Sequence, residues 1–136
     1  MPPESQKNGS PDHWLRYAQA DLDLARVPLP KRGMYELLCF LVQQAAEKSI
    51  KAVLVSAGVE FPRTHDLQAL VDLLPAKIHR STALNVVARL TAYAVSSCYP
   101  GEEEPVTEEE YREALQLAEA VVAWAEAYLH SDVESE

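Results

Sequence analysis

Apolar residues recur at helical spacing along four long stretches of the chain, and no stretch alternates apolar and polar residues as a strand does. We expect long helices over residues 11 to just before Pro28, over about 33–58, over about 78–97 and over about 107–129. A short helix is expected over about 65–74. Because the links are mostly short, the pattern predicts an all-α fold, an up-and-down four-helix bundle with one short additional helix.

The expected helix ends carry side chains that suit them. Ser10 and Thr64 have hydroxyls that accept a hydrogen bond from a first-turn N–H, so each is expected to cap a helix. Thr107 and Glu110 have the spacing of a capping box at the start of the last helix. Gly58 offers the left-handed conformation that ends the second helix.

The same spacing predicts which side chains of the two central helices face the core. They are Leu37, Leu38, Leu41, Ala45, Val53 and Leu54 on the helix over 33–58, and Leu84, Val87, Ala88, Thr91, Ala94 and Val95 on the helix over 78–97. Two cysteines, Cys39 and Cys98, lie in apolar surroundings without Cys-x-x-Cys spacing, so we expect buried thiols.

The length of 136 residues allows one core of ordinary density, because 48% of the residues are apolar. We expect a flexible N-terminus over 1–10, the helical bundle over 11–129 and a flexible acidic tail over 130–136. The longest apolar stretch, residues 37–42, is far shorter than the ~20 residues of a membrane-spanning helix. With no signal-like apolar stretch at its start, the chain is expected in the cytoplasm.

The net charge of −9 is distributed unevenly along the chain. Residues 1–100 carry eleven Lys or Arg and nine Asp or Glu, whereas residues 101–136 carry one Arg and twelve acidic residues. A chain this acidic is repelled by phosphate backbones, so we do not expect generic binding of nucleic acid.

Sequence motifs of common enzymes are absent. The chain has no Walker loop, dinucleotide-binding glycine fingerprint, His-Glu-x-x-His or Gly-x-Ser-x-Gly. The spacing of His, Cys, Asp and Glu does not match a zinc or calcium site, so we expect neither a metal ion nor a cofactor.

Polar residues interrupt the middle of the second predicted helix. Gln43, Glu47 and Lys51 share one row, and Gln44 and Lys48 share the next, because residues four apart lie on one face. One interpretation is a solvated face supported by a Glu47–Lys51 pair. The other is a groove in which lysine binds phosphate and glutamine binds a base or a partner's backbone.

A second polar cluster stands before the short helix, where Arg63, Thr64, His65 and Asp66 follow one another. Helix N-termini attract anions, so the cluster could belong to a binding site. The alternative is structural, since Asp66 can satisfy the helix end and orient His65.

These residues carry a resemblance to a known family. The matching residues are Gln43, Gln44, Glu47, Lys48, Lys51, Gly58, Phe61, Thr64, His65, Asp66, Leu67, Tyr99 and Pro100, after an entry pattern of Trp14, Leu15, Ala18, Asp21, Leu22 and Ala25. Over about residues 12–129 the chain resembles the HEPN domain, the "higher eukaryotes and prokaryotes nucleotide-binding" family. The resemblance implies an up-and-down helical bundle, a homodimer and a partner that is a minimal nucleotidyltransferase in a toxin/antitoxin-like pair.

The resemblance has two gaps. RNA-cleaving members carry an Arg followed four to six residues later by a His, and this chain has no such pair, so we do not expect RNA cleavage. Cys98 stands where relatives tend to have an Arg before the Tyr-Pro pair. The residues left as candidates for ligand binding are Gln43, Gln44, Glu47, Lys48, Lys51, His65, Asp66 and Tyr99.

We therefore expect a non-catalytic helical interaction module that pairs with a minimal nucleotidyltransferase. The alternative is a protein that binds a nucleotide in a groove of Lys, Gln and His side chains. A nuclease is the third and least favoured hypothesis.

Overall fold

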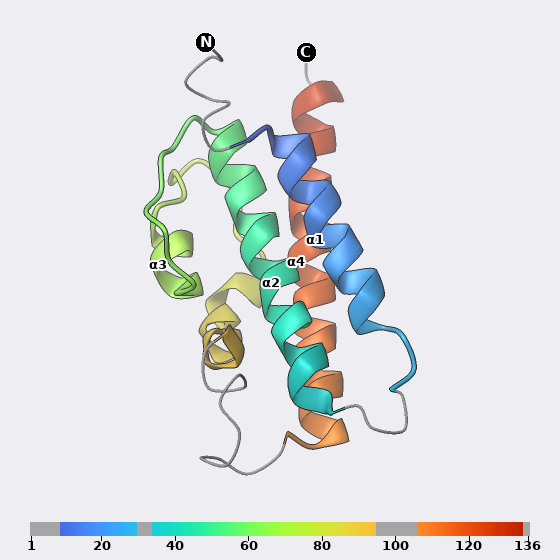
Figure 1. Cartoon of the computed structure of the whole chain (residues 1–136). Helices are drawn as coiled ribbons and strands as arrows, with labels where there is room; N and C mark the ends of the chain where they lie inside the picture. The colour runs from blue at the N-terminus through green and yellow to red at the C-terminus, as the bar shows by residue number, and fades with distance from the viewer. Residues whose placement is uncertain (1–8, 30–33, 95–105, 135–136) are drawn as a thin grey trace.

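The computed structural model describes residues 9–29, 34–94 and 106–134. Three long helices run side by side: α1 (Pro11–Ala25), α2 (Tyr35–Ser56) and α4 (Glu108–Glu134). The chain reverses direction between α1 and α2, and α4 runs in the same direction as α2 (Figure 1). The described residues form helices and loops with no strand, which confirms the predicted all-α bundle. None of the described helices is long and apolar enough to cross a membrane.

Most of the predicted helix ends are confirmed. The Ser10 hydroxyl accepts a hydrogen bond from the His13 N–H at 3.1 Å. Thr107 and Glu110 form the reciprocal capping box, with the two bonds at 3.0 and 3.1 Å. Gly58 has a φ of 74°, a backbone conformation that side chains with a Cβ rarely adopt.

The start of the short helix differs from the prediction. Helix α3 (Leu67–Asp72) is capped by Asp66, whose carboxylate accepts from the Ala69 N–H at 3.2 Å, and not by Thr64. The Thr64 hydroxyl accepts instead from the Asp66 N–H at 3.0 Å, which turns the chain just before the helix. Two nearby cap-forming residues compete here, and the one nearer the apolar stripe begins the helix.

The predicted helix over 78–97 is wrong in its geometry. Residues 78–81 lie outside any helix, and the described residues after them form two 3-10 helices, η2 (Thr82–Asn85) and η3 (Val87–Ala94). They are separated at Val86, whose φ of −123° and ψ of 10° lie outside the helical range. Asn85 and several β-branched residues give this stretch a weak preference for α-helix. Val95 lies outside the described residues.

The 3-10 geometry also changes which residues face the core. Leu84, Val87 and Leu90 are buried at a spacing of three, which matches three residues per turn. Ala88, which we expected inward at the α-helical period, is exposed. Thr91 is half-buried, and its hydroxyl accepts from the Leu67 N–H at 3.1 Å.

Helix α4 continues past Leu129, where we expected it to end, to Glu134. No Gly or Pro follows Leu129 to stop it. Most of the segment predicted as a flexible tail is therefore helical.

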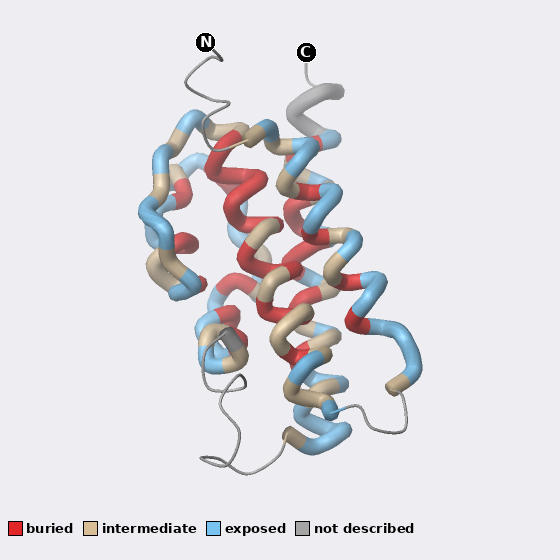
Figure 2. The backbone as a smooth tube through the Cα atoms, in the orientation of Figure 1, coloured by how far each residue is buried: buried red, intermediate tan, exposed pale blue. Residues whose placement is uncertain are grey.

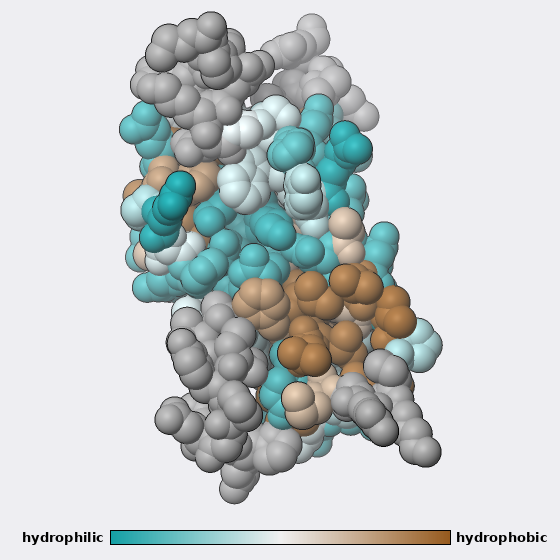
Figure 3. All heavy atoms as spheres, in the orientation of Figure 1, coloured by the Kyte–Doolittle hydropathy of each residue, from teal (hydrophilic) through white to brown (hydrophobic). Residues whose placement is uncertain are grey.

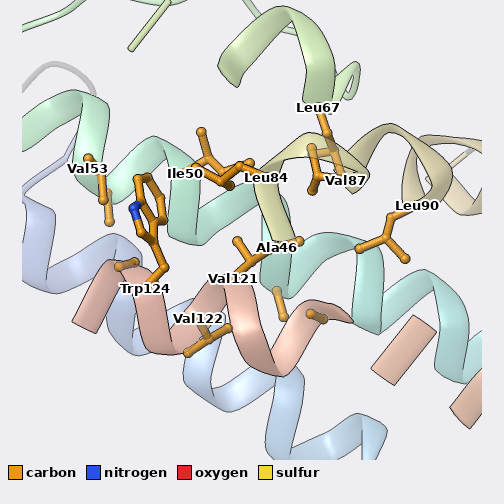
Figure 4. Packing of buried hydrophobic residues seen from close by; sticks show 14 of the residues in the cluster. Ala46, Ile50, Val53, Leu67, Leu84, Val87, Leu90, Val121, Val122 and Trp124 are labelled. Carbon is orange, nitrogen blue, oxygen red and sulfur yellow. The ribbon is translucent and has the colours of Figure 1, made fainter. Parts of the chain in front are cut away.

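Helix α2 lies at the centre of the core, and Figure 2 shows it as the most continuously buried element. Figure 4 shows side chains of α2, α3, η2, η3 and α4 meeting between the helices, among them Ile50, Leu84 and Val121. Cys39 is buried as predicted, and its burial, with a smaller effect of nearby acidic groups, raises the thiol pKa to about 12. Leu37, predicted to be buried, is 57% exposed. Cys98 lies outside the described residues.

Candidate functional site

The polar row of α2 is buried and organised around one carboxylate. Glu47 is 3% exposed and lies in the middle of the helix. Its Oε2 accepts from Lys51 Nζ at 2.9 Å, and its Oε1 accepts from Gln43 Nε2 at 3.0 Å. All three side chains come from one face of α2, as their spacing of four predicts.

The loop before α3 supplies a third partner for this carboxylate. His65 Nδ1 lies 2.7 Å from Glu47 Oε1. A carboxylate only accepts hydrogen bonds, so Nδ1 carries the proton and donates it. Gln43 Nε2 also donates to the His65 carbonyl oxygen at 3.3 Å. The loop is thus tied to α2 through a side chain and through its backbone.

The carboxyl group of Glu47 is ionised because its partners outweigh its burial. Burial alone raises its pKa, but hydrogen bonds from Lys51, His65 and Gln43, together with the positive charge of Lys51, lower the pKa below its usual value. Glu47 and Lys51 therefore form a buried ion pair, and the carboxylate also accepts hydrogen bonds from Gln43 and His65.

The ammonium group of Lys51 is enclosed by aromatic rings. Nζ lies 5.5 Å from the ring centre of Trp14 on α1 and 5.4 Å from that of Phe61 in the loop after α2. These rings attract the cation through their negatively charged faces. The rings and the Glu47 carboxylate together surround this charge.

Lys48 takes part in a separate contact between helices. Its Nζ donates to Asp21 Oδ2 of α1 at 2.7 Å and lies 5.6 Å from the centre of the Tyr17 ring. Gln44 Nε2 donates to Gln43 Oε1 at 2.7 Å, which attaches it to the edge of the Glu47 network.

The structure brings together five of the residues predicted for one site: Gln43, Gln44, Glu47, Lys51 and His65. Lys48 points to α1, and Asp66 is occupied as the cap of α3. Tyr99 lies outside the described residues. The side chain of His65 is 58% exposed, which makes it the member of the network most accessible to solvent.

A second surface was not identified from the sequence. Four large apolar residues are exposed around the end of α1 and the start of α2: Leu24 on α1, Val27 just after it, Met34 just before α2 and Leu37 on α2. We call these four residues the apolar surface. Figure 3 shows an apolar patch on the lower part of the α1 and α2 face, below a mainly polar area.

A pattern in the sequence does indicate this surface. Residues 37–42 are apolar on all sides of the helix, which is typical of a helix covered all round. The described part of the chain buries the inner side of this segment, as at Cys39 and Val42, and leaves Leu37 exposed. An apolar stripe wider than the intramolecular core needs is typical of a contact surface.

Among the described residues, no group of three or more His, Cys, Asp or Glu side chains is arranged to hold a metal ion.

Comparison with known proteins gives the family. The sequence model of the HEPN domain family matches residues 12–128 of this chain. TT1696 from Thermus thermophilus has a similar structure, with a TM-score of 0.76 and 28% identity over 86% of this chain and 96% of that one. ST0689, an archaeal HEPN homologue, has a TM-score of 0.68 and 30% identity over 88% of this chain and 97% of that one. No curated protein matches the chain significantly. The chain therefore belongs to the HEPN domain family.

Proposed function

We propose that the chain is a homodimeric helical interaction module that binds a minimal nucleotidyltransferase in a toxin/antitoxin-like pair in the cytoplasm. The observation that carries the proposal is the apolar surface of α1 and α2. Leu24, Val27, Met34 and Leu37 are each about half exposed. Exposed apolar side chains grouped where one helix ends and the next begins favour a protein contact.

The apolar surface is best suited to a second copy of the chain. In a two-fold dimer the same patch meets itself, so apolar residues from one protomer cover apolar residues of the other. The transferase partner would then bind the dimer. This part of the proposal rests on the family, whose prokaryotic members are often paired with such enzymes.

The polar network supports a structural role more than nucleotide binding. Lys51 is neutralised by Glu47, and Lys48 is neutralised by Asp21. A phosphate would have to displace a carboxylate from each lysine. The network instead holds the loop before α3 against α2, which preserves the shape of the module.

Nucleotide binding at Gln43, Gln44, Lys48, Lys51 and His65 is the alternative, favoured by the exposure of the His65 ring. Isothermal titration of ATP, GTP and a dinucleotide decides between the two. We expect no saturable heat. A saturable heat that disappears in Lys48→Ala would replace our proposal with the alternative.

The oligomeric state tests the main proposal. Light scattering coupled to size-exclusion chromatography should give a dimer for the native chain and a monomer for Leu37→Glu. Ala123→Glu, which places the same charge at an exposed position of α4, is the matched control and should remain dimeric. A native monomer, or a Leu37→Glu dimer, would contradict the proposed interface.

Partner binding is tested by co-expression with a minimal nucleotidyltransferase whose gene neighbours that of this chain. We expect the two proteins to co-purify at a defined ratio. If they elute separately although each is folded, the chain is not the partner of that enzyme.

A further inference from the structure

A groove outside the polar network and the apolar surface lies between η3 and α4. Its volume is about 390 Å3. Val86, Leu90 and Leu117 give it apolar walls, Tyr93 adds an aromatic ring, and Glu110 and Glu113 contribute two carboxylates from one side of α4. The volume is near the lower end of the roughly 300–1,000 Å3 of ligand pockets, so it suits a few side chains of a partner.

The groove has a negative electrostatic character. Glu110 and Glu113 are exposed, and Tyr93 is half-buried. Glu110 Oε1 also accepts from the Thr107 N–H in the capping box, so Glu113 is the carboxylate with no hydrogen bond within the described part of the chain. Burial raises the pKa of the Tyr93 phenol, and the acidic groups of Cys39, Glu110 and Glu113 raise it further. The negative charges of both glutamates are therefore close enough to affect the phenol that lines the groove. Among the described residues that line the groove, Arg89 is the one cation, and it is exposed, so two carboxylates stand against one guanidinium there.

This combination selects a class of occupant. The apolar walls favour aliphatic side chains, and the carboxylates with the aromatic ring favour a lysine or arginine beside them. Phosphate-bearing ligands are repelled by the same carboxylates. We propose that the groove between η3 and α4 binds a basic, apolar peptide segment of a partner protein.

The proposal does not depend on the dimer or on the identity of the transferase. The groove residues are distinct from Leu24, Val27, Met34 and Leu37, so loss of the apolar surface leaves the groove intact. The two sites are therefore separable by mutation.

A fluorescein-labelled peptide of Leu and Lys at helical spacing is the probe, with fluorescence anisotropy as the readout. We expect saturable binding that Glu113→Gln weakens about two- to fivefold, the size of one partly exposed ion pair. Val86→Ser, at an exposed wall position, should weaken it as well. Glu109→Gln removes the same charge from an exposed position of α4 outside the groove and should change the affinity by less than about 1.5-fold.

Three results would overturn the proposal. One is equal weakening by Glu113→Gln and Glu109→Gln, which means that only the overall charge attracts the peptide. Another is equal binding of a peptide with Glu in place of Lys. The third is a loss of binding in Leu37→Glu together with unchanged binding in Val86→Ser. That result would place the peptide on the apolar surface.

Discussion

Glu47 on α2 and His65 in the loop before α3 are joined by a 2.7 Å contact between Oε1 and Nδ1. The contact links residues 18 positions apart in the chain, and it connects the most buried helix to an exposed imidazole. Because Glu47 also accepts from Lys51, one carboxylate ties the loop before α3 to α2 and balances a buried cation. The effects of this arrangement on stability and on the imidazole are measurable.

Replacement of Glu47 by Gln should destabilise the fold strongly. The variant leaves the Lys51 ammonium buried without its counter-charge, which costs about 3–5 kcal/mol when one partner of a buried ion pair is removed. Urea unfolding followed by circular dichroism measures the change. Glu109→Gln, the same substitution at an exposed position of α4, should change the free energy of unfolding by less than about 0.5 kcal/mol. Equal changes in the free energy of unfolding would mean that Glu47 contributes no more to stability than an exposed glutamate does.

The same carboxylate predicts a dependence of stability on pH. The pKa of Glu47 is lower in the folded chain than in the unfolded one, where a glutamate has a pKa of about 4.3. Its contribution is therefore fully present above about pH 4.3 and is lost as the pH falls through the folded-state pKa. The difference in unfolding free energy between the native chain and Glu47→Gln should shrink as the pH falls below about 4.3, towards the folded-state pKa. A difference that is constant over this range would show that Glu47 is not ionised in the fold.

His65 should adopt one tautomer. When the imidazole is neutral, its proton should reside on Nδ1, since that atom faces the Glu47 carboxylate. Nitrogen-15 NMR distinguishes the two ring nitrogens by their chemical shifts. The Nδ1–H form should dominate in the native chain, whereas Arg63→Ala, a change at an exposed neighbour, should leave the tautomer unaltered. A dominant Nε2–H form would contradict the contact.

Local signals in the chain were sufficient for most of the helices. Caps such as Ser10 and the pair of Thr107 and Glu110 act within a single turn, so their effect can be derived from neighbouring residues alone. The break at Val86 was missed because the α-helical period was applied where Leu84, Val87 and Leu90 repeat every three residues. That spacing was a visible signal of a 3-10 helix.

The candidate site depended on contacts that the sequence does not encode locally. The spacing of Gln43, Glu47 and Lys51 predicted a shared helix face, and the structure confirms it. Whether that face was solvated or buried depended on Trp14 and Phe61, which reach Lys51 from other parts of the chain. Long-range packing of this kind decides burial, so the sequence left both interpretations open.

The ion pair of Lys48 and Asp21 should couple α1 to α2. Both side chains are mostly buried, at 22% and 18% exposure, so a double-mutant cycle of Lys48→Met and Asp21→Asn should give a coupling of about 1 kcal/mol. The matched control is the exposed pair of Arg112 and Glu108 within α4, where about 0.3–0.5 kcal/mol is expected. A structural role predicts that the buried pair couples more strongly than the exposed one in urea unfolding. If Lys48 and Asp21 couple no more strongly than the control, Asp21 does not hold the Lys48 cation, and Lys48 is free to bind an anionic ligand.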